Sequence, residues 1–83
     1  MRIYQDTSLS DLLLAAQDNL RDVAPGEVVT VRDLFRGFEW KRLKPPVPSQ
    51  LGTLFFAYAK AEGKEIVEVG PKNKQNQQQY IKK

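Results

Sequence analysis

The side chains of this chain that are best suited to chemistry are its lysines and arginines, and most of them fall in its second half. Residues 1–40 hold four basic and seven acidic side chains, whereas residues 41–83 hold nine basic and three acidic ones. The whole chain of 83 residues carries a net charge of +3. A concentration of positive charge on a small protein is typical of a surface that binds a polyanion, although a merely solvated surface gives the same pattern.

Catalytic chemistry has little support in the sequence. Histidine and cysteine are both absent, which removes the commonest general base, the commonest metal ligand and thiolate chemistry. Glu65 and Glu68 lie three residues apart in a predicted strand, so their side chains point to opposite faces. Asp18 and Asp22 share a helix face that has no apolar pocket to shift their pKa values. We therefore expect a protein that is not an enzyme and that uses no metal and no cofactor.

The length and composition bound the kind of protein that this chain forms. A chain of 83 residues is long enough for one small domain, so a single domain over residues 1–83 is expected. No stretch approaches the roughly 20 apolar residues of a membrane span, and the first residues lack the apolar segment of a secretory signal. Together with the absence of cysteine, these features predict a soluble cytoplasmic protein with no membrane partner.

In the first half of the chain, residues that cap or break helices predict where the secondary-structure elements begin and end. Ser8 precedes apolar residues at helical spacing, which predicts a helix over residues 8–23 that Pro25-Gly26 ends. The β-branched run at residues 27–31 predicts a short strand.

A second, short helix is expected next. Thr30 can cap it with Asp33 at its third position, and it carries Leu34 and Phe35 and ends at Gly37. Residues 38–43 fit either a helical extension or an irregular turn.

The second half predicts a helix followed by a hairpin. Lys44-Pro45-Pro46-Val47-Pro48 reads as a stiff connector, because proline lacks an amide donor. A third helix then runs from Pro48 to Gly63. Residues 65–69 form a strand that Gly70-Pro71 breaks, and Tyr80-Ile81 form the partner strand. The intervening residues 72–79 are polar and basic, and they are too many for a tight turn.

This order of elements predicts an α+β fold of the winged helix-turn-helix type, with three helices, a short first strand and a C-terminal β-hairpin wing. In such folds the third helix can enter the major groove of DNA while the wing reaches a neighbouring phosphate track or groove. Gly52 lies inside the third helix, and we expect it to allow tight packing against the segment that contains Trp40. Phe35, Phe38 and Trp40 are expected in the core, or as a lid over it, rather than as base-stacking groups.

The candidate nucleic-acid site combines three sets of residues. They come from the segment before the third helix, from the face of that helix turned away from the core, and from the wing. Their side chains suit phosphate contacts or the reading of base edges. The predicted site residues are Lys41, Arg42, Lys44, Ser49, Gln50, Thr53, Lys60, Lys72, Lys74, Gln75 and Gln77.

Three segments resemble a known family. They are Leu34–Leu43, with the sequence LFRGFEWKRL, Leu51–Phe55, with LGTLF, and Gln78–Tyr80, with QQY. The pattern is similar to that of a conserved family of unknown function in short proteins of Gram-positive bacteria, their phages and their plasmids. The resemblance covers residues 27–82. It implies a winged-helix-like fold and a regulatory or mobile-element setting, and it supplies no activity.

Two functions from different classes remain open at this stage. The first is a DNA-binding module whose partner is double-stranded DNA. The second is a protein-interaction module, such as a phage-type inhibitor of a host nucleic-acid enzyme, which would use the acidic first helix and the region of Phe38 and Trp40. A homodimer is compatible with the first function, because DNA operators are often two-fold symmetric, but the sequence has no heptad seam.

Overall fold

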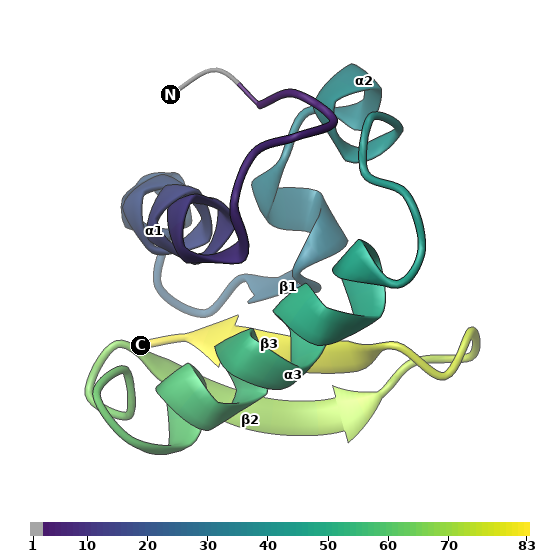
Figure 1. Ribbon diagram of the computed structural model, residues 1–83. Coiled ribbons are helices and arrows are strands. Elements are labelled where there is room, and N and C mark those ends of the chain that lie inside the picture. The colour runs from purple at the N-terminus through teal and green to yellow at the C-terminus, as the bar shows by residue number, and fades with distance from the viewer. Residues whose placement is uncertain (1–2) are drawn as a thin grey trace.

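A computed structural model describes residues 3–83 as three α-helices and one three-stranded antiparallel sheet. The helices are α1 (Leu9–Asn19), α2 (Gly37–Trp40) and α3 (Val47–Lys60), and the strands are β1 (Val28–Val29), β2 (Val67–Lys72) and β3 (Gln78–Lys82). Two short 3-10 helices, η1 (Leu20–Asp22) and η2 (Arg32–Leu34), link them. Helix α3 lies across one face of the sheet and contacts α1 (Figure 1). The predicted α+β class is therefore confirmed.

The core lies between the helices and the inner face of the sheet. Strand β3 is central, since the strand order is β1-β3-β2. Tyr80 of β3 pairs with Val29 on one side and Val69 on the other, and its ring meets the ring of Phe55 edge-on, with centroids 4.8 Å apart. The largest fully buried side chains are Ile3, Leu12, Leu20, Leu51, Phe55, Val67 and Tyr80.

The predicted first helix is confirmed, with a tighter last turn. The Ser8 hydroxyl accepts the amide hydrogen of Asp11 at 3.2 Å, which caps α1. After Asn19 the chain tightens into η1 instead of continuing as α-helix. Gly26 then turns the chain at φ +90°, a backbone conformation that favours glycine.

The prediction of a short helix that carries Phe35 and ends at Gly37 is wrong. Thr30 and Asp33 do cap each other, because each amide donates to the other's side-chain oxygen, at 2.9 and 3.3 Å. The element they cap is only η2, and Phe35 is already extended, with φ −124° and ψ 151°. Gly37 instead begins α2, because the Glu39 carboxylate accepts the amide hydrogen of Arg36 and starts a new helix.

Helix α3 begins and ends earlier than expected. It includes Val47 and stops at Lys60, whereas the sequence predicted a helix from Pro48 to Gly63. The Gly63 amide donates back to the carbonyl of Tyr58 at 2.8 Å, which closes a turn after the helix. A β-carbon on Gly63 would lie only 2.5 Å from the Tyr58 ring, so a larger residue here would displace that ring.

The strands also differ from expectation. Strand β1 is shorter than the predicted 27–31, because Thr30 turns away to cap η2. Strand β2 continues through Gly70-Pro71, which the sequence predicted to break it. The register shifts between Val69 and Lys72, and the side-chain amide of Gln78 donates to the Gly70 carbonyl. A bulge of this kind tolerates proline, which has no amide hydrogen for the ladder. The β2–β3 loop, residues 73–77, is therefore shorter than the predicted 72–79.

Candidate functional site: the cleft between helix α3 and the β2–β3 loop

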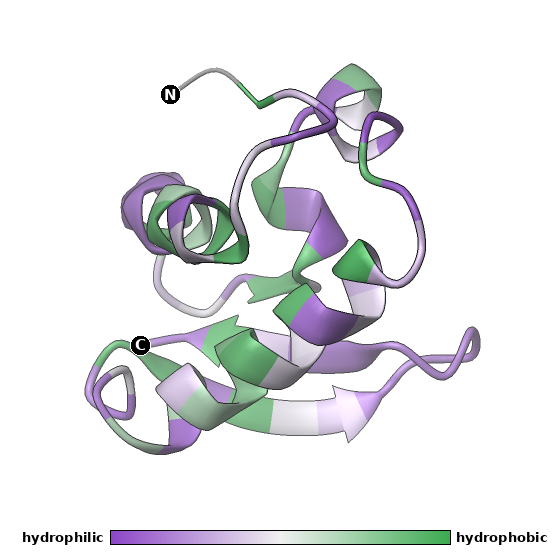
Figure 2. Cartoon of the chain, viewed as in Figure 1, coloured by the Kyte–Doolittle hydropathy of each residue, from purple (hydrophilic) through white to green (hydrophobic). Residues whose placement is uncertain are grey.

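The β2–β3 loop extends beyond the sheet on the side where α3 begins (Figure 1). It is hydrophilic along its length (Figure 2). Within the loop, the side-chain oxygen of Asn73 accepts the amide hydrogens of Gln75 and Gln77, at 3.0 and 2.9 Å. Asn76 has a positive φ of 63°, which asparagine tolerates better than most residues. These features give the loop a defined shape.

A cleft of about 620 Å³ separates this loop from α3. One wall is formed by the first turns of α3, and the opposite wall by the loop together with the end of β2 and the start of β3. Residues after β1 and from the end of α2 complete it. Its lining residues are Thr30, Val31, Arg32, Trp40, Pro48, Ser49, Gly52, Thr53, Phe56, Lys72, Asn76, Gln77, Gln78 and Tyr80.

The charge of the cleft is uniformly positive. Its charged lining residues are Arg32 and Lys72, and no carboxylate among residues 3–83 belongs to the lining. Both cations are exposed to solvent. A surface of this kind attracts anions, and the attraction is stronger where the walls are poorly polarisable.

The cleft brings together four of the predicted site residues. Ser49 and Thr53 come from α3, and Lys72 and Gln77 come from β2 and the loop. Gln75 lies beside them, in a smaller hollow of about 380 Å³ that Gln77, Arg32 and the acidic Asp33 also line. Residues distant in sequence thus share one concave surface.

Other predicted site residues lie outside this cleft. Gln50 is exposed on α3, Lys74 is exposed in the loop, and Lys41 and Lys44 are exposed between α2 and α3. Lys60 ends α3, and its ammonium lies 4.8 Å from the centre of the Phe56 ring, a residue that does line the cleft.

Arg42 makes its contacts outside the cleft. Its guanidinium donates to the carbonyl of Ile3 at 2.6 Å. It also lies 5.3 Å from the centre of the Tyr4 ring and 5.2 Å from that of Phe38. These contacts join α2 to the N-terminal segment, and Arg42 is not among the residues that line the cleft.

Sequence reasoning missed Arg32, Phe56 and Trp40 as cleft residues. Phe35 is buried as expected, with its ring centroid 5.8 Å from that of Trp40, but Trp40 is only half-buried and lines the cleft. Arg32 lies in the acidic half of the chain, so the charge distribution along the sequence did not mark it as a site residue. Its position directly after the first strand was the available signal, since that strand pairs with the hairpin.

The expected reason for Gly52 is also wrong. A β-carbon built on Gly52 meets no atom within 4 Å, so no tight packing against the Trp40 segment excludes a side chain there. Gly52 instead lines the cleft. Its missing side chain leaves space on the surface of α3.

A buried hydroxyl adjoins the same region. Tyr80 is 1% exposed and lines the cleft. Its hydroxyl has no hydrogen-bond partner among residues 3–83. Burial raises the pKa of this hydroxyl to about 12, because the charged phenolate would be poorly solvated.

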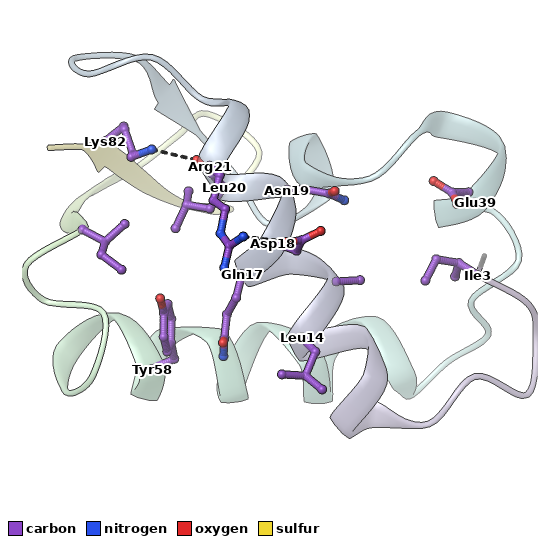
Figure 3. A pocket seen from close by; sticks show the side chains of 12 residues that line it. Ile3, Leu14, Gln17, Asp18, Asn19, Leu20, Arg21, Glu39, Tyr58 and Lys82 are labelled. Atoms are coloured by element: carbon purple, nitrogen blue, oxygen red, sulfur yellow. Dashed lines mark hydrogen bonds and ion pairs between the residues drawn. The ribbon is translucent and has the colours of Figure 1, made fainter. Parts of the chain in front are cut away.

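A second hollow of about 420 Å³ runs along α1 and η1 (Figure 3). Its charged groups are already used within the protein. Lys82 points toward η1 and donates to the carbonyls of Leu20 and Val23, at 2.8 and 3.0 Å, and Arg21 pairs with Asp18 at 3.4 Å. Lys82 therefore holds the end of β3 against η1. Among residues 3–83, the charged groups that line this hollow already have partners within the protein.

The fold and the cleft define a small α+β domain with one basic concave surface between a helix and a β-hairpin. A family model for a domain of unknown function, DUF1413, matches residues 15–82, so the chain belongs to this family. No curated protein and no solved structure matches the chain. Among residues 3–83, no helix has the length and apolar character needed to cross a bilayer, and no group of acidic side chains is arranged to hold a metal ion.

Proposed function

We propose that this chain is a winged helix-turn-helix module that binds double-stranded DNA, with α3 in the major groove and the β2–β3 loop as the wing. The order helix, strand, helix, helix, strand, loop, strand and the sheet order β1-β3-β2 support this assignment. The resemblance to short proteins of phages and plasmids supports a regulatory role in a mobile element.

The observation that carries the proposal is the cleft itself. Ser49 and Thr53 on α3 face the same hollow as Lys72 and Gln77 on the hairpin, and the charged lining is wholly cationic. A DNA strand that passes from the helix to the wing would therefore meet donors and positive charge along its path. Such phosphate contacts fix the position of a protein on DNA and supply most of its salt-dependent affinity.

The N-terminal end of α3 supports binding of an anion in the same place. No acidic residue occupies its first turn, and no side chain caps it. The positive end of the helix dipole is therefore not neutralised by the protein's own carboxylates. Ser49 lies in this turn and in the cleft.

The exposed face of α3 is suited to reading base edges. Gln50 is exposed and can bond bidentately to adenine. The Thr53 hydroxyl is already bonded to the carbonyl of Ser49 at 3.2 Å, so its methyl group remains for contact with a thymine methyl.

Fluorescence anisotropy with a labelled random-sequence duplex tests the proposal. At about 50 mM salt the wild-type protein should bind, and its affinity should fall steeply as salt is raised. Lys72→Gln should weaken binding roughly three- to tenfold on every sequence and reduce the slope of log K against log salt by about 1. Lys64→Gln removes the same charge beyond α3, outside the cleft, and should change the affinity much less. Absence of binding at the low salt concentration would refute the proposal.

A second function has one specific observation in its favour. Phe38 is 53% exposed and Tyr4 is 48% exposed, and both rings contact the Arg42 guanidinium. Exposed aromatic and arginine side chains are enriched at protein interfaces. A protein partner that binds there would lose affinity on Phe38→Ala, whereas DNA binding through the cleft would not change.

A further inference from the structure

The floor of the cleft has a chemistry that duplex binding alone does not explain. Trp40 and Phe56 line it with half-buried aromatic rings. Between the cleft and the axis of α3 lies Gly52, where a β-carbon would meet nothing within 4 Å. Glycine is a poor helix former, and neither crowding nor a positive φ requires it at this position. The space over Gly52 is therefore available to a ligand that lies against the helix.

The rim of the cleft offers the complementary polar groups. Arg32 and Lys72 come from two different elements and are both exposed. Gln77 adds a side-chain amide, and its oxygen already accepts from Asn73 at 3.1 Å, so its amide hydrogens remain as donors. Tyr80 also lines the cleft, and its buried hydroxyl has no hydrogen-bond partner among residues 3–83. Native proteins seldom leave a buried polar group without a partner.

We propose that this cleft binds one nucleotide unit, with the base or sugar against Trp40 and Phe56 and the phosphate on Arg32 and Lys72. Flat aromatic surface and cationic groups around one hollow are the features with which proteins hold unpaired nucleotides. The cleft, at about 620 Å³, falls in the size range of small-molecule sites. The nucleotide is either a free mononucleotide or one unit of a bound DNA strand, and in the second case the inference rests on the proposed function.

Trp40 makes the site directly observable. It is the only tryptophan of the sequence, so its fluorescence reports on the cleft without labelling. Titration of the full chain with dTMP and with dAMP, excited at the red edge of tryptophan absorption, should change the Trp40 emission saturably. The corresponding nucleosides should bind about tenfold more weakly, because they lack the charge-assisted contacts of the phosphate. Inorganic phosphate alone should leave the emission unchanged.

Two variants connect this signal to the cleft. Gly52→Leu fills the space over the helix and should abolish the nucleotide-dependent change while the protein keeps its helical circular dichroism. The double variant Arg32→Gln/Lys72→Gln should weaken nucleotide binding at least fivefold and leave nucleoside binding unchanged. Lys64→Gln is the matched control, with wild-type nucleotide binding expected. The double variant keeps the test decisive if Gly52→Leu does not fold.

Measuring duplex binding by the same variants shows whether the site holds a free nucleotide or one unit of a bound DNA strand. If Gly52→Leu loses affinity for both the mononucleotide and the DNA, the site holds a unit of the bound strand. If it loses only the mononucleotide, the site holds a free nucleotide. The inference is overturned if no nucleotide changes the Trp40 emission at millimolar concentration, or if Gly52→Leu binds nucleotides as the wild type does. If the nucleotide inference fails but the wild-type protein binds duplex DNA, the proposed function stands. If the protein binds nucleotides but not duplex DNA, only the proposed function is overturned.

Discussion

The side-chain oxygen of Asn73 accepts the amide hydrogen of Gln77 at 2.9 Å, and the Asn73 amide hydrogen in turn reaches the Gln77 carbonyl at 2.9 Å. These bonds close the β2–β3 loop from both ends. Lys72 precedes this pair directly, and Gln77 is one of its members, so the loop wall of the cleft depends on Asn73 for its shape.

Asn73→Ala should therefore affect binding more than stability. The variant loses the side-chain acceptor that organises the loop, so duplex affinity should fall severalfold. The free energy of unfolding should fall by only about 0.5–1.5 kcal/mol, because a solvated loop can exchange these bonds for water. Anisotropy and urea denaturation measure the two effects. Gln17→Ala, on α1 and outside the cleft, is the control and should bind as the wild type does. An unfolding change that fully accounts for the loss of affinity would contradict this explanation.

Replacement of Gly26 and of Gly52 by alanine should change the free energy of unfolding in opposite directions. Neither position has an atom within 4 Å of an added β-carbon, so sterics do not separate them. Gly26 has φ +90°, so Gly26→Ala should destabilise the protein by about 1–2 kcal/mol. Gly52 lies inside α3, so Gly52→Ala should stabilise it by up to about 1 kcal/mol. Chemical denaturation monitored by circular dichroism gives both values, and changes of the same sign would refute the reasoning.

The fold was predictable where local signals agreed with each other. Ser8 and the apolar spacing after it defined α1, and the run of residues 51–59 defined α3. The sequence failed where a single side-chain contact decided the path of the backbone. Gly70-Pro71 indicated a strand break, but the register shifts there and the side-chain amide of Gln78 donates to the Gly70 carbonyl, so β2 continues past Pro71. Glu39 folds back onto Arg36 and so makes Gly37 a helix start.

The candidate site was predictable only in part, since four of the eleven predicted residues line the cleft. Lys72 and Gln77 stood out because they belong to a polar, basic loop, and Thr53 stood out on the wet face of a helix. Arg32 did not, because it lies in the acidic half of the chain and only the pairing of β1 with β3 brings it to the hairpin. Charge read along the sequence does not show which cations share a surface.

Glu39 should make the stability depend on pH in the acid range. Its side chain is 5% exposed, and hydrogen bonding to Arg36 lowers the pKa of the Glu39 carboxyl below its ordinary value. Because the folded pKa is depressed, this contribution is present above about pH 4.3, the unfolded value, and is lost as the pH falls through the folded pKa. Glu39→Gln should cost about 1 kcal/mol at pH 7, and the difference from wild type should shrink at pH 3.

Urea denaturation at the two pH values measures this effect. The exposed ion pair of Asp18 with Arg21 provides a matched control, since pairs of this kind contribute little to stability. Asp18→Asn should therefore leave the free energy of unfolding nearly unchanged at both pH values. A Glu39→Gln cost that stays constant from pH 7 to pH 3 would show that the charge of Glu39 does not contribute.

Tyr80 should give the opposite dependence in the alkaline range. Burial raises the pKa of its hydroxyl to about 12, whereas an unfolded tyrosine ionises near pH 10. The unfolded state therefore loses its proton first. The stability due to Tyr80 is complete below about pH 10 and decreases by up to about 1.4 kcal/mol per pH unit as the pH rises toward 12.

Tyr80→Phe removes both this dependence and the unpartnered hydroxyl. At pH 7 it should stabilise the protein by about 1 kcal/mol, since a buried hydroxyl without a hydrogen bond costs free energy. Between pH 9 and pH 11 the variant should lose less stability than the wild type in thermal or urea denaturation. Tyr4→Phe, at an exposed position, is the control and should behave as the wild type does. A destabilised Tyr80→Phe would mean that the buried hydroxyl has a hydrogen-bond partner in solution, and it would contradict this explanation.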